Sequence, residues 1–186
     1  MRFLLVWLGS SLIIINNCIA QDSLKVKNET TVGFLLGQNN SDIGLQHYSG
    51  VFIKDYNIEA GIVLGYDKYE YFTINPIGVA LKTTLFNGKN VDTVIGFNAG
   101  LGFFFFQDKE EQTKYQPQLF TNPNLSFRFG KTRKVKFNVN VGYKTQNAKT
   151  TTITPENNDT WWPQPATKTV GEYNLQRVII GVGLSY

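Results

Sequence analysis

The chain has 186 residues and a formal net charge of +4, with charges of both signs interspersed along it. Its largest basic cluster is only Lys131, Arg133, Lys134 and Lys136, so it lacks the footprint typical of a nucleic-acid-binding protein. Phenylalanine, tyrosine and glycine are abundant. This composition favours an aromatic-rich β protein over a helical one.

Residues 1–20 have the pattern of a secretory signal peptide. Arg2 supplies the positive start, an apolar run follows, and Cys18-Ile19-Ala20 places small residues before a cut ahead of Gln21. The apolar run is too short for a transmembrane helix. A lipoprotein signal centred on Cys18 fits poorly, because two asparagines precede it. The sequence therefore predicts an exported chain.

The predicted mature domain is 21–186. Losing Arg2 lowers the net charge from +4 to +3, since the signal holds no acidic residue. The only cysteine is lost too, so a disulfide-stabilised domain is excluded. We expect no cofactor and no metal, because no cluster of cysteine, histidine and acidic residues has metal-ligand spacing.

Apolar residues recur at every second position, which predicts strands with one apolar and one polar face. We expect eight strands, over about 25–37, 43–53, 58–67, 76–86, 91–104, 119–129, Val135 to Lys144 and Arg177 to Tyr186. Pro123 cannot donate to a ladder, so it predicts a bulge or a late start in the sixth strand.

The last strand ends on an aromatic residue. Its apolar row is Val178, Ile180, Val182, Leu184 and Tyr186. A membrane barrel closes its last strand on its first, and an aromatic residue anchors that end at the membrane interface. The same pattern alone also fits the last strand of a soluble β-sandwich.

The connections differ in length in an alternating way. Tight turns are expected at Lys54–Asn57, Asn87–Asn90 and Gly130–Arg133, and longer loops at about 68–75, 105–118 and 146–172. Outer-membrane barrels alternate tight periplasmic turns with long outer loops. Glycine and asparagine recur in the polar rows, as a narrow barrel interior requires.

These features resemble the small eight-stranded outer-membrane barrels of the OmpX and OmpA-domain type, within the porin-family or outer-membrane β-barrel domain proteins. The resemblance implies an all-β, eight-stranded antiparallel up-and-down transmembrane β-barrel in the cell outer membrane. It also implies contact with outer-membrane lipid and lipopolysaccharide. The row Val178, Ile180, Val182, Leu184 and Tyr186 would be the insertion signal that the barrel-insertion machinery reads.

The inward rows predict a polar network that fills the lumen, since isolated charges in so narrow a space are costly. The expected members are Glu29, Glu59, Lys82, Asn98, Asn124, Arg128, Lys136, Asn138, Asn140 and Arg177.

No catalytic set is visible, so we expect a non-enzymatic barrel with structural or interaction roles. A small porin and a soluble lipocalin-like binding barrel are the alternatives. An outer-membrane lipid hydrolase using His47 and Ser49 is less favoured, because neither a nucleophile elbow nor an oxyanion loop accompanies them.

The predicted loop 146–172 is longer than a connection requires. Trp161 and Trp162 stand beside two prolines in it and form a candidate contact surface for a protein, glycan or lipopolysaccharide partner. The competing interpretation places both in the aromatic belt at the membrane interface.

Overall fold

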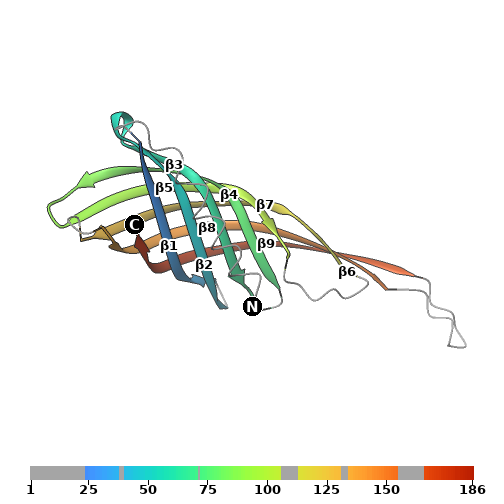
Figure 1. The fold of residues 1–186 in the computed structure, drawn as a ribbon. Coiled ribbons are helices and arrows are strands. Elements are labelled where there is room, and N and C mark those ends of the chain that lie inside the picture. The colour runs from blue at the N-terminus through green and yellow to red at the C-terminus, as the bar shows by residue number, and fades with distance from the viewer. Residues whose placement is uncertain (1–23, 38–39, 71, 106–112, 131–133, 155–165) are drawn as a thin grey trace, which may run out of the picture.

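A computed structural model describes residues 24–37, 40–70, 72–105, 113–130, 134–154 and 166–186. The predicted signal peptide lies outside them. Within these residues no helix is long and apolar enough to cross a membrane. The elements, labelled in Figure 1, are β1 (Leu24–Leu36), β2 (Ser41–Ile53), the 3-10 helix η2 (Lys54–Tyr56), β3 (Ile58–Lys68), β4 (Thr73–Asn87), β5 (Val91–Phe103), β6 (Thr113–Gln116), β7 (Gln118–Phe129), β8 (Lys136–Thr154) and β9 (Thr167–Ser185).

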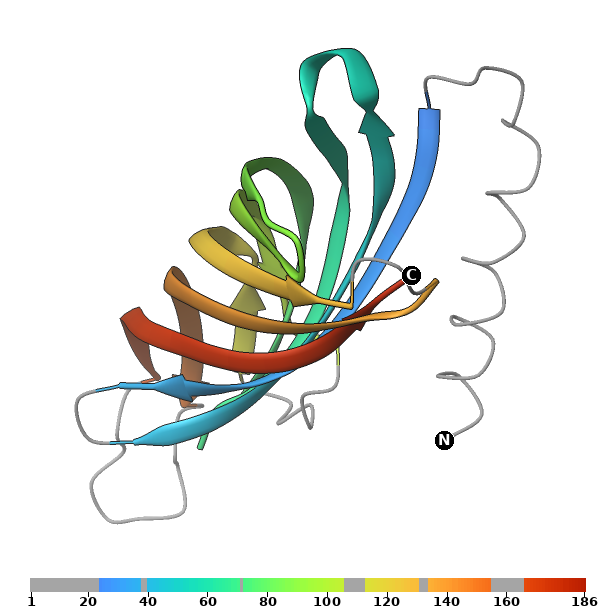
Figure 2. The same cartoon turned by 90° about the vertical axis from the view of Figure 1, so that its left-hand side faces the viewer.

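Eight strands close into an antiparallel barrel, seen in Figure 2, in the order β1-β2-β3-β4-β5-β7-β8-β9. The closing pair is β1 with β9, from Glu29 opposite Ser185 to Leu36 opposite Val178. Two backbone hydrogen bonds between Asn28 and Tyr186, of 2.8 and 2.9 Å, extend this pair by one step. Short β6 pairs only with β8. The predicted fold class is therefore confirmed.

The pleat separates the side chains into an outward apolar row and an inward polar row. In β8 the inward Asn138, Asn140 and Lys144 are buried, whereas the outward Val141 and Tyr143 are exposed. Outward apolar side chains recur around the barrel, among them Phe34, Ile62, Leu81, Phe97, Leu101, Ile180 and Val182. The wall is thus apolar outside and polar inside, the reverse of a soluble barrel.

The end of the barrel that carries Asn28 and Tyr186 is called here the terminal end, and the opposite end the distal end. The three predicted tight turns lie at the terminal end. Asn57 ends η2 in the left-handed conformation, with φ 54°, and its side chain donates to Thr84 O at 2.9 Å. Gly130, with φ 89°, begins the β7–β8 turn. In the β2–β3 and β7–β8 turns, a residue with positive φ lets the chain reverse without strain.

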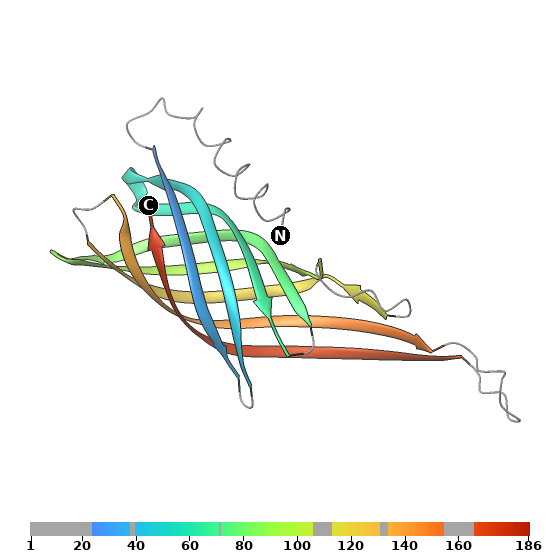
Figure 3. The ribbon, with the colours of Figure 1, turned by 60° about the horizontal axis from the view of Figure 1, so that its bottom comes forward.

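The distal connections differ from the prediction. The loop expected at 68–75 is only 69–72, because β4 begins at Thr73. The prediction of a loop at 146–172 is largely wrong, because β8 and β9 continue as a paired ribbon to Thr154 opposite Thr167. Figures 1 and 3 show this β8–β9 ribbon extending past the other strands. The sequence of this ribbon shows no continuous alternation of apolar and polar residues, but its many threonines have high strand propensity.

The sixth predicted strand, β7, runs through Pro123 without a bulge or a late start. Pro123 faces Phe97 in the β5 ladder. The β7–β8 ladder omits Asn122 and Pro123, yet its register is the same on both sides of the gap. A proline is tolerated here because it lies where the ladder to β8 is interrupted.

Candidate functional site

The terminal half of the interior is built around Arg128 of β7. Its Nη1 donates to Glu59 Oε1 at 2.6 Å and its Nη2 donates to Glu59 Oε2 at 2.9 Å. Nη2 also donates to Glu29 Oε2 at 3.0 Å. Glu29 lies on β1 and Glu59 on β3, so one guanidinium joins strands on opposite sides of the barrel. A planar guanidinium suits this double pairing better than an ammonium does.

Lys82 of β4 completes this Arg128 cluster. Its Nζ lies 3.0 Å from Glu29 Oε1 and 4.1 Å from the centre of the Tyr48 ring. The side chains of Glu29, Glu59, Lys82 and Arg128 are all at least nine-tenths buried. Beside the cluster, Lys136 pairs with Asp92 at 2.7 Å. The charges therefore cancel locally, which buried ions require.

Asparagine and serine side chains fill the middle of the interior. Asn140 donates to Ser126 Oγ at 2.8 Å and Asn138 donates to Ser185 Oγ at 3.0 Å. Asn124 donates to the backbone carbonyl of Asn122 at 3.1 Å. Both amide atoms of the fully buried Asn98 have no partner among the described residues. Small amides of this kind fill a narrow lumen without adding net charge.

Two ion pairs occupy the distal half. Lys144 of β8 pairs with Asp67 of β3. Arg177 of β9 lies 3.3 Å from Asp42 of β2 and is partly exposed. Arg177 is thus in the interior, but far from the Arg128 cluster, because β9 runs from the distal to the terminal end.

An apolar cluster covers these distal pairs. It consists of Leu35, Tyr69, Phe72, Ile74 and Ala148, with Phe104, Leu175 and Ile179 packed against it. We call this cluster the aromatic roof. The Phe72 ring lies 5.5 Å from the Tyr69 ring, 6.0 Å from the Phe104 ring and 5.5 Å from the Tyr173 ring. These separations suit tilted and edge-on aromatic contacts.

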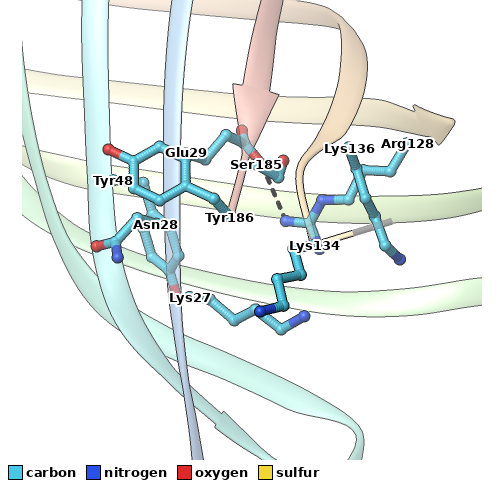
Figure 4. A pocket seen from close by; sticks show the side chains of 9 residues that line it. All are labelled: Lys27, Asn28, Glu29, Tyr48, Arg128, Lys134, Lys136, Ser185 and Tyr186. Carbon is cyan, nitrogen blue, oxygen red and sulfur yellow. Dashed lines mark hydrogen bonds and ion pairs between the residues drawn. The ribbon is translucent and has the colours of Figure 1, made fainter. Parts of the chain in front are cut away.

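Two cavities of the interior differ in size. One of about 250 Å³ lies at the terminal end beside the Arg128 cluster, and Figure 4 shows its lining side chains. The other, of about 30 Å³, lies between Asp67, Asn122 and Lys144. Within the described residues, no group of three or more histidine, cysteine, aspartate and glutamate side chains could hold a metal ion.

The comparisons with known proteins agree with this architecture. The crystal structure of Neisserial surface protein A (NspA) matches with a TM-score of 0.58 at 10% identity, covering 88% of this chain and 96% of that one. The crystal structure of the outer membrane protein OprG from Pseudomonas aeruginosa matches with a TM-score of 0.54 at 13% identity, covering 88% and 95%. The solid-state NMR structure of outer membrane protein AlkL in lipid bilayers matches with a TM-score of 0.51 at 13% identity, covering 88% and 87%.

This chain has the fold of the small outer-membrane β-barrels. At 10–13% identity the likeness extends to the fold and no further. No protein-family model matches the sequence, and no curated protein matches it.

His47 and Ser49, the pair of the less favoured hydrolase alternative, do not form a catalytic arrangement within the described residues of this barrel. His47 lies on the outward row of β2, and its Nδ1 is 2.9 Å from Thr30 Oγ1 of the neighbouring strand. No carboxylate within the described residues pairs with His47. Trp161 and Trp162 lie outside the described residues.

Four charged residues of the interior network are missing from the set that the sequence predicts. The carboxylates of Asp42, Asp67 and Asp92, and the ammonium of Lys144, were not among the expected network. All four take the inward phase of their strands, which is a signal that the sequence does contain. Their pairing depends on which strands face each other across the lumen, and no local pattern encodes that.

Proposed function

We propose that this protein is an exported, integral outer-membrane barrel with a closed interior and no enzymatic activity. The observation that carries the proposal is the outward apolar row around a charge-paired interior. Residues 1–20 would direct export, and the outward row from Val178 to Tyr186 would be read by the insertion machinery. Contact with lipid and lipopolysaccharide would follow from the same outward row.

The orientation of the two rows argues against a lipocalin-like soluble barrel. Such a binder lines its cavity with apolar side chains and turns polar ones to water. Here Val182, Leu81 and Val79 are more than half exposed, while Glu29 and Lys82 are buried. In a water-soluble barrel this arrangement would cost free energy in two ways. The buried charges would lose their hydration, and the apolar outer surface would be exposed to water.

The interior argues against a porin. The Arg128 cluster spans the lumen, and the aromatic roof covers the distal end. An eight-stranded barrel leaves room for little more than side chains. The proposed role is therefore structural or one of interaction, carried by the surfaces that the barrel presents rather than by passage through it.

Cell fractionation and electrophysiology test this proposal. The natively expressed protein should sediment with outer membranes and migrate differently on gels before and after boiling. Reconstituted in planar bilayers, it should show no steady conductance. Recovery in the soluble periplasmic fraction would overturn the membrane assignment, and a steady, large conductance would overturn the closed interior.

A second candidate function is surface binding through the β8–β9 ribbon. Pairing of β1 with β9 stops at Val178, but pairing of β8 with β9 continues for eleven further steps, from Lys144–Arg177 to Thr154–Thr167. A ribbon this long is unnecessary for closing the barrel. A protein, glycan or lipopolysaccharide partner would meet this ribbon first.

Two matched replacements separate the role of the paired strands from that of residues 155–166. Replacing 150–171 by Asn-Gly joins Lys149 to Glu172, and replacing 155–166 by Asn-Gly joins Thr154 to Thr167; both joined pairs are already opposite each other. Asn-Gly favours tight hairpin turns, so both variants should insert and remain heat-modifiable. Binding to a lipopolysaccharide-coated surface should be lost in the first variant. Loss in both would assign binding to residues 155–166, which include Trp161 and Trp162, and retention in both would refute the candidate.

A further inference from the structure

Within the described residues, the terminal end of the interior contains cations that no carboxylate pairs. Every inward carboxylate is matched to a cation. The pairs join Glu29 with Lys82 and Arg128, Glu59 with Arg128, Asp92 with Lys136, Asp67 with Lys144, and Asp42 with Arg177. Lys27 lies on the same inward row of β1 as Glu29, yet no carboxylate of the described residues pairs with it. Its Nζ lies 5.9 Å from the centre of the Phe52 ring.

Lys27 lines the terminal cavity of about 250 Å³ together with three other cations, Arg128, Lys134 and Lys136 (Figure 4). Lys134 likewise has no carboxylate partner within the described part of the chain. Glu29 is the only acidic side chain of the lining, and Lys82, Arg128 and Ser185 already occupy it. The cavity is therefore cationic, and it is larger than a single water molecule needs.

Two buried donors of the lining have no acceptor. The Tyr48 hydroxyl and Arg128 Nε make no hydrogen bond within the described residues, although both side chains are at least nine-tenths buried. Leaving a buried donor unpaired costs free energy, so each such group in a folded protein calls for a partner. The unpaired donors and the unpaired cations that line this cavity suit the same kind of ligand, one that is negatively charged and rich in acceptor oxygens.

We propose that the terminal cavity binds a phosphate or carboxylate group. Lys27 and Lys134 supply the charge, and the Tyr48 hydroxyl donates a hydrogen bond. Oxyanions form short, charge-assisted hydrogen bonds with such donors. Because the cavity lies at the barrel rim, the group can come from a lipid headgroup or from a free anion. The site is independent of the distal ribbon and of the closed lumen.

An NMR titration of the full barrel in nanodiscs tests the site. In zwitterionic nanodiscs, inorganic phosphate is added and the amide signals of Asn28, Glu29 and Ser185 are followed. A second arm replaces free phosphate with increasing phosphatidylglycerol in the disc. Binding in the first arm identifies a free anion as sufficient, and a response in the second arm alone identifies a headgroup. No response in either arm overturns the proposal.

Matched variants establish whether the cavity lysines are responsible. K27Q combined with K134Q should weaken the apparent affinity at least about tenfold. K54Q combined with K89Q removes the same charge from the same end of the barrel but from outside the cavity lining, and it should leave the affinity unchanged. Y48F, which keeps the ring beside Lys82, should weaken binding less than the double lysine variant. Equal weakening by both double variants would indicate a general charge effect and overturn the site.

Discussion

The two ends of the barrel interior are closed by different physical means. At the terminal end a cluster of fully buried charges, centred on Arg128, spans the lumen beside an open cationic cavity. At the distal end an aromatic roof, centred on Phe72, covers two separate ion pairs. The same wall of alternating side chains surrounds both. The side chains that fill a narrow barrel can thus differ in kind from one end of the interior to the other.

The comparison shows where the interior is sensitive to change. A charge cluster is sensitive to the loss of one member, because the remaining charge stays buried without a partner. An apolar cluster loses contacts in proportion to the area removed and tolerates rearrangement. The terminal end should therefore be the less tolerant of the two.

The largest expected effect is that of Arg128→Met. It removes the only cation paired with Glu59 in the described residues, and it should lower the free energy of unfolding by about 3–5 kcal/mol. Urea unfolding in lipid vesicles measures this. Arg177→Met is the matched distal control, and it should cost less because the Arg177–Asp42 pair is partly exposed. Equal losses at both sites would contradict the asymmetry between the ends.

Val139→Arg tests whether the outward row of the barrel wall, which both ends share, faces lipid. Val139 lies on the outward row of β8, opposite Phe127 and Val182. An arginine facing lipid at the bilayer midplane costs about 2–4 kcal/mol, and the same unfolding experiment measures it. Val135→Arg, outside the strand at the exposed terminal rim, should cost much less. A negligible effect at Val139 would show that this row does not face lipid.

Phe72→Ala probes the aromatic roof. We expect a loss of about 2 kcal/mol, below the usual range for enclosed phenylalanines, because the neighbouring Tyr173 is exposed. Unfolding in vesicles gives the loss. Phe105→Ala, a change of the same size at an exposed distal position, is the control. A loss as large as that of Arg128→Met would mean that the roof, rather than the charges, dominates interior stability.

The smallest effect concerns an ion pair on the β8–β9 ribbon. Lys149 Nζ lies 2.6 Å from Glu172, and this hydrogen bond, followed by the lysine charge, holds the pKa of Glu172 below its ordinary value of 4.5. A lowered carboxyl pKa stabilises the folded ribbon above pH 4.5, and that contribution is lost as the pH falls through the folded pKa. A carbon-13 NMR titration should show Glu172 titrating below pH 4.5 and Lys149→Gln raising its midpoint. An unchanged midpoint would show that the pair does not persist in solution.

The sequence by itself determined the strands and their phase. Alternation in β8, from Lys136 to Lys144, predicted which side chains share a face, because a pleated strand allows only two rows. The inward positions of Glu29, Arg128 and Asn138 followed from the same rule. Where apolar alternation ended, the prediction failed: the threonine-rich ribbon beyond Gln146 was interpreted as a loop.

Only the tertiary structure decided which inward residues meet. Arg128 reaches Glu29 across 99 positions of sequence, and this contact exists because β1 closes on β9 and sets the stagger of all strands around the ring. The same closure decides three further features: Arg177 lies far from the Arg128 cluster, the aromatic roof forms at the distal end, and Lys27 has no carboxylate partner within the described residues. A strand's phase is a local property of its backbone, whereas a partner across the lumen is fixed by the register of every ladder between the two strands.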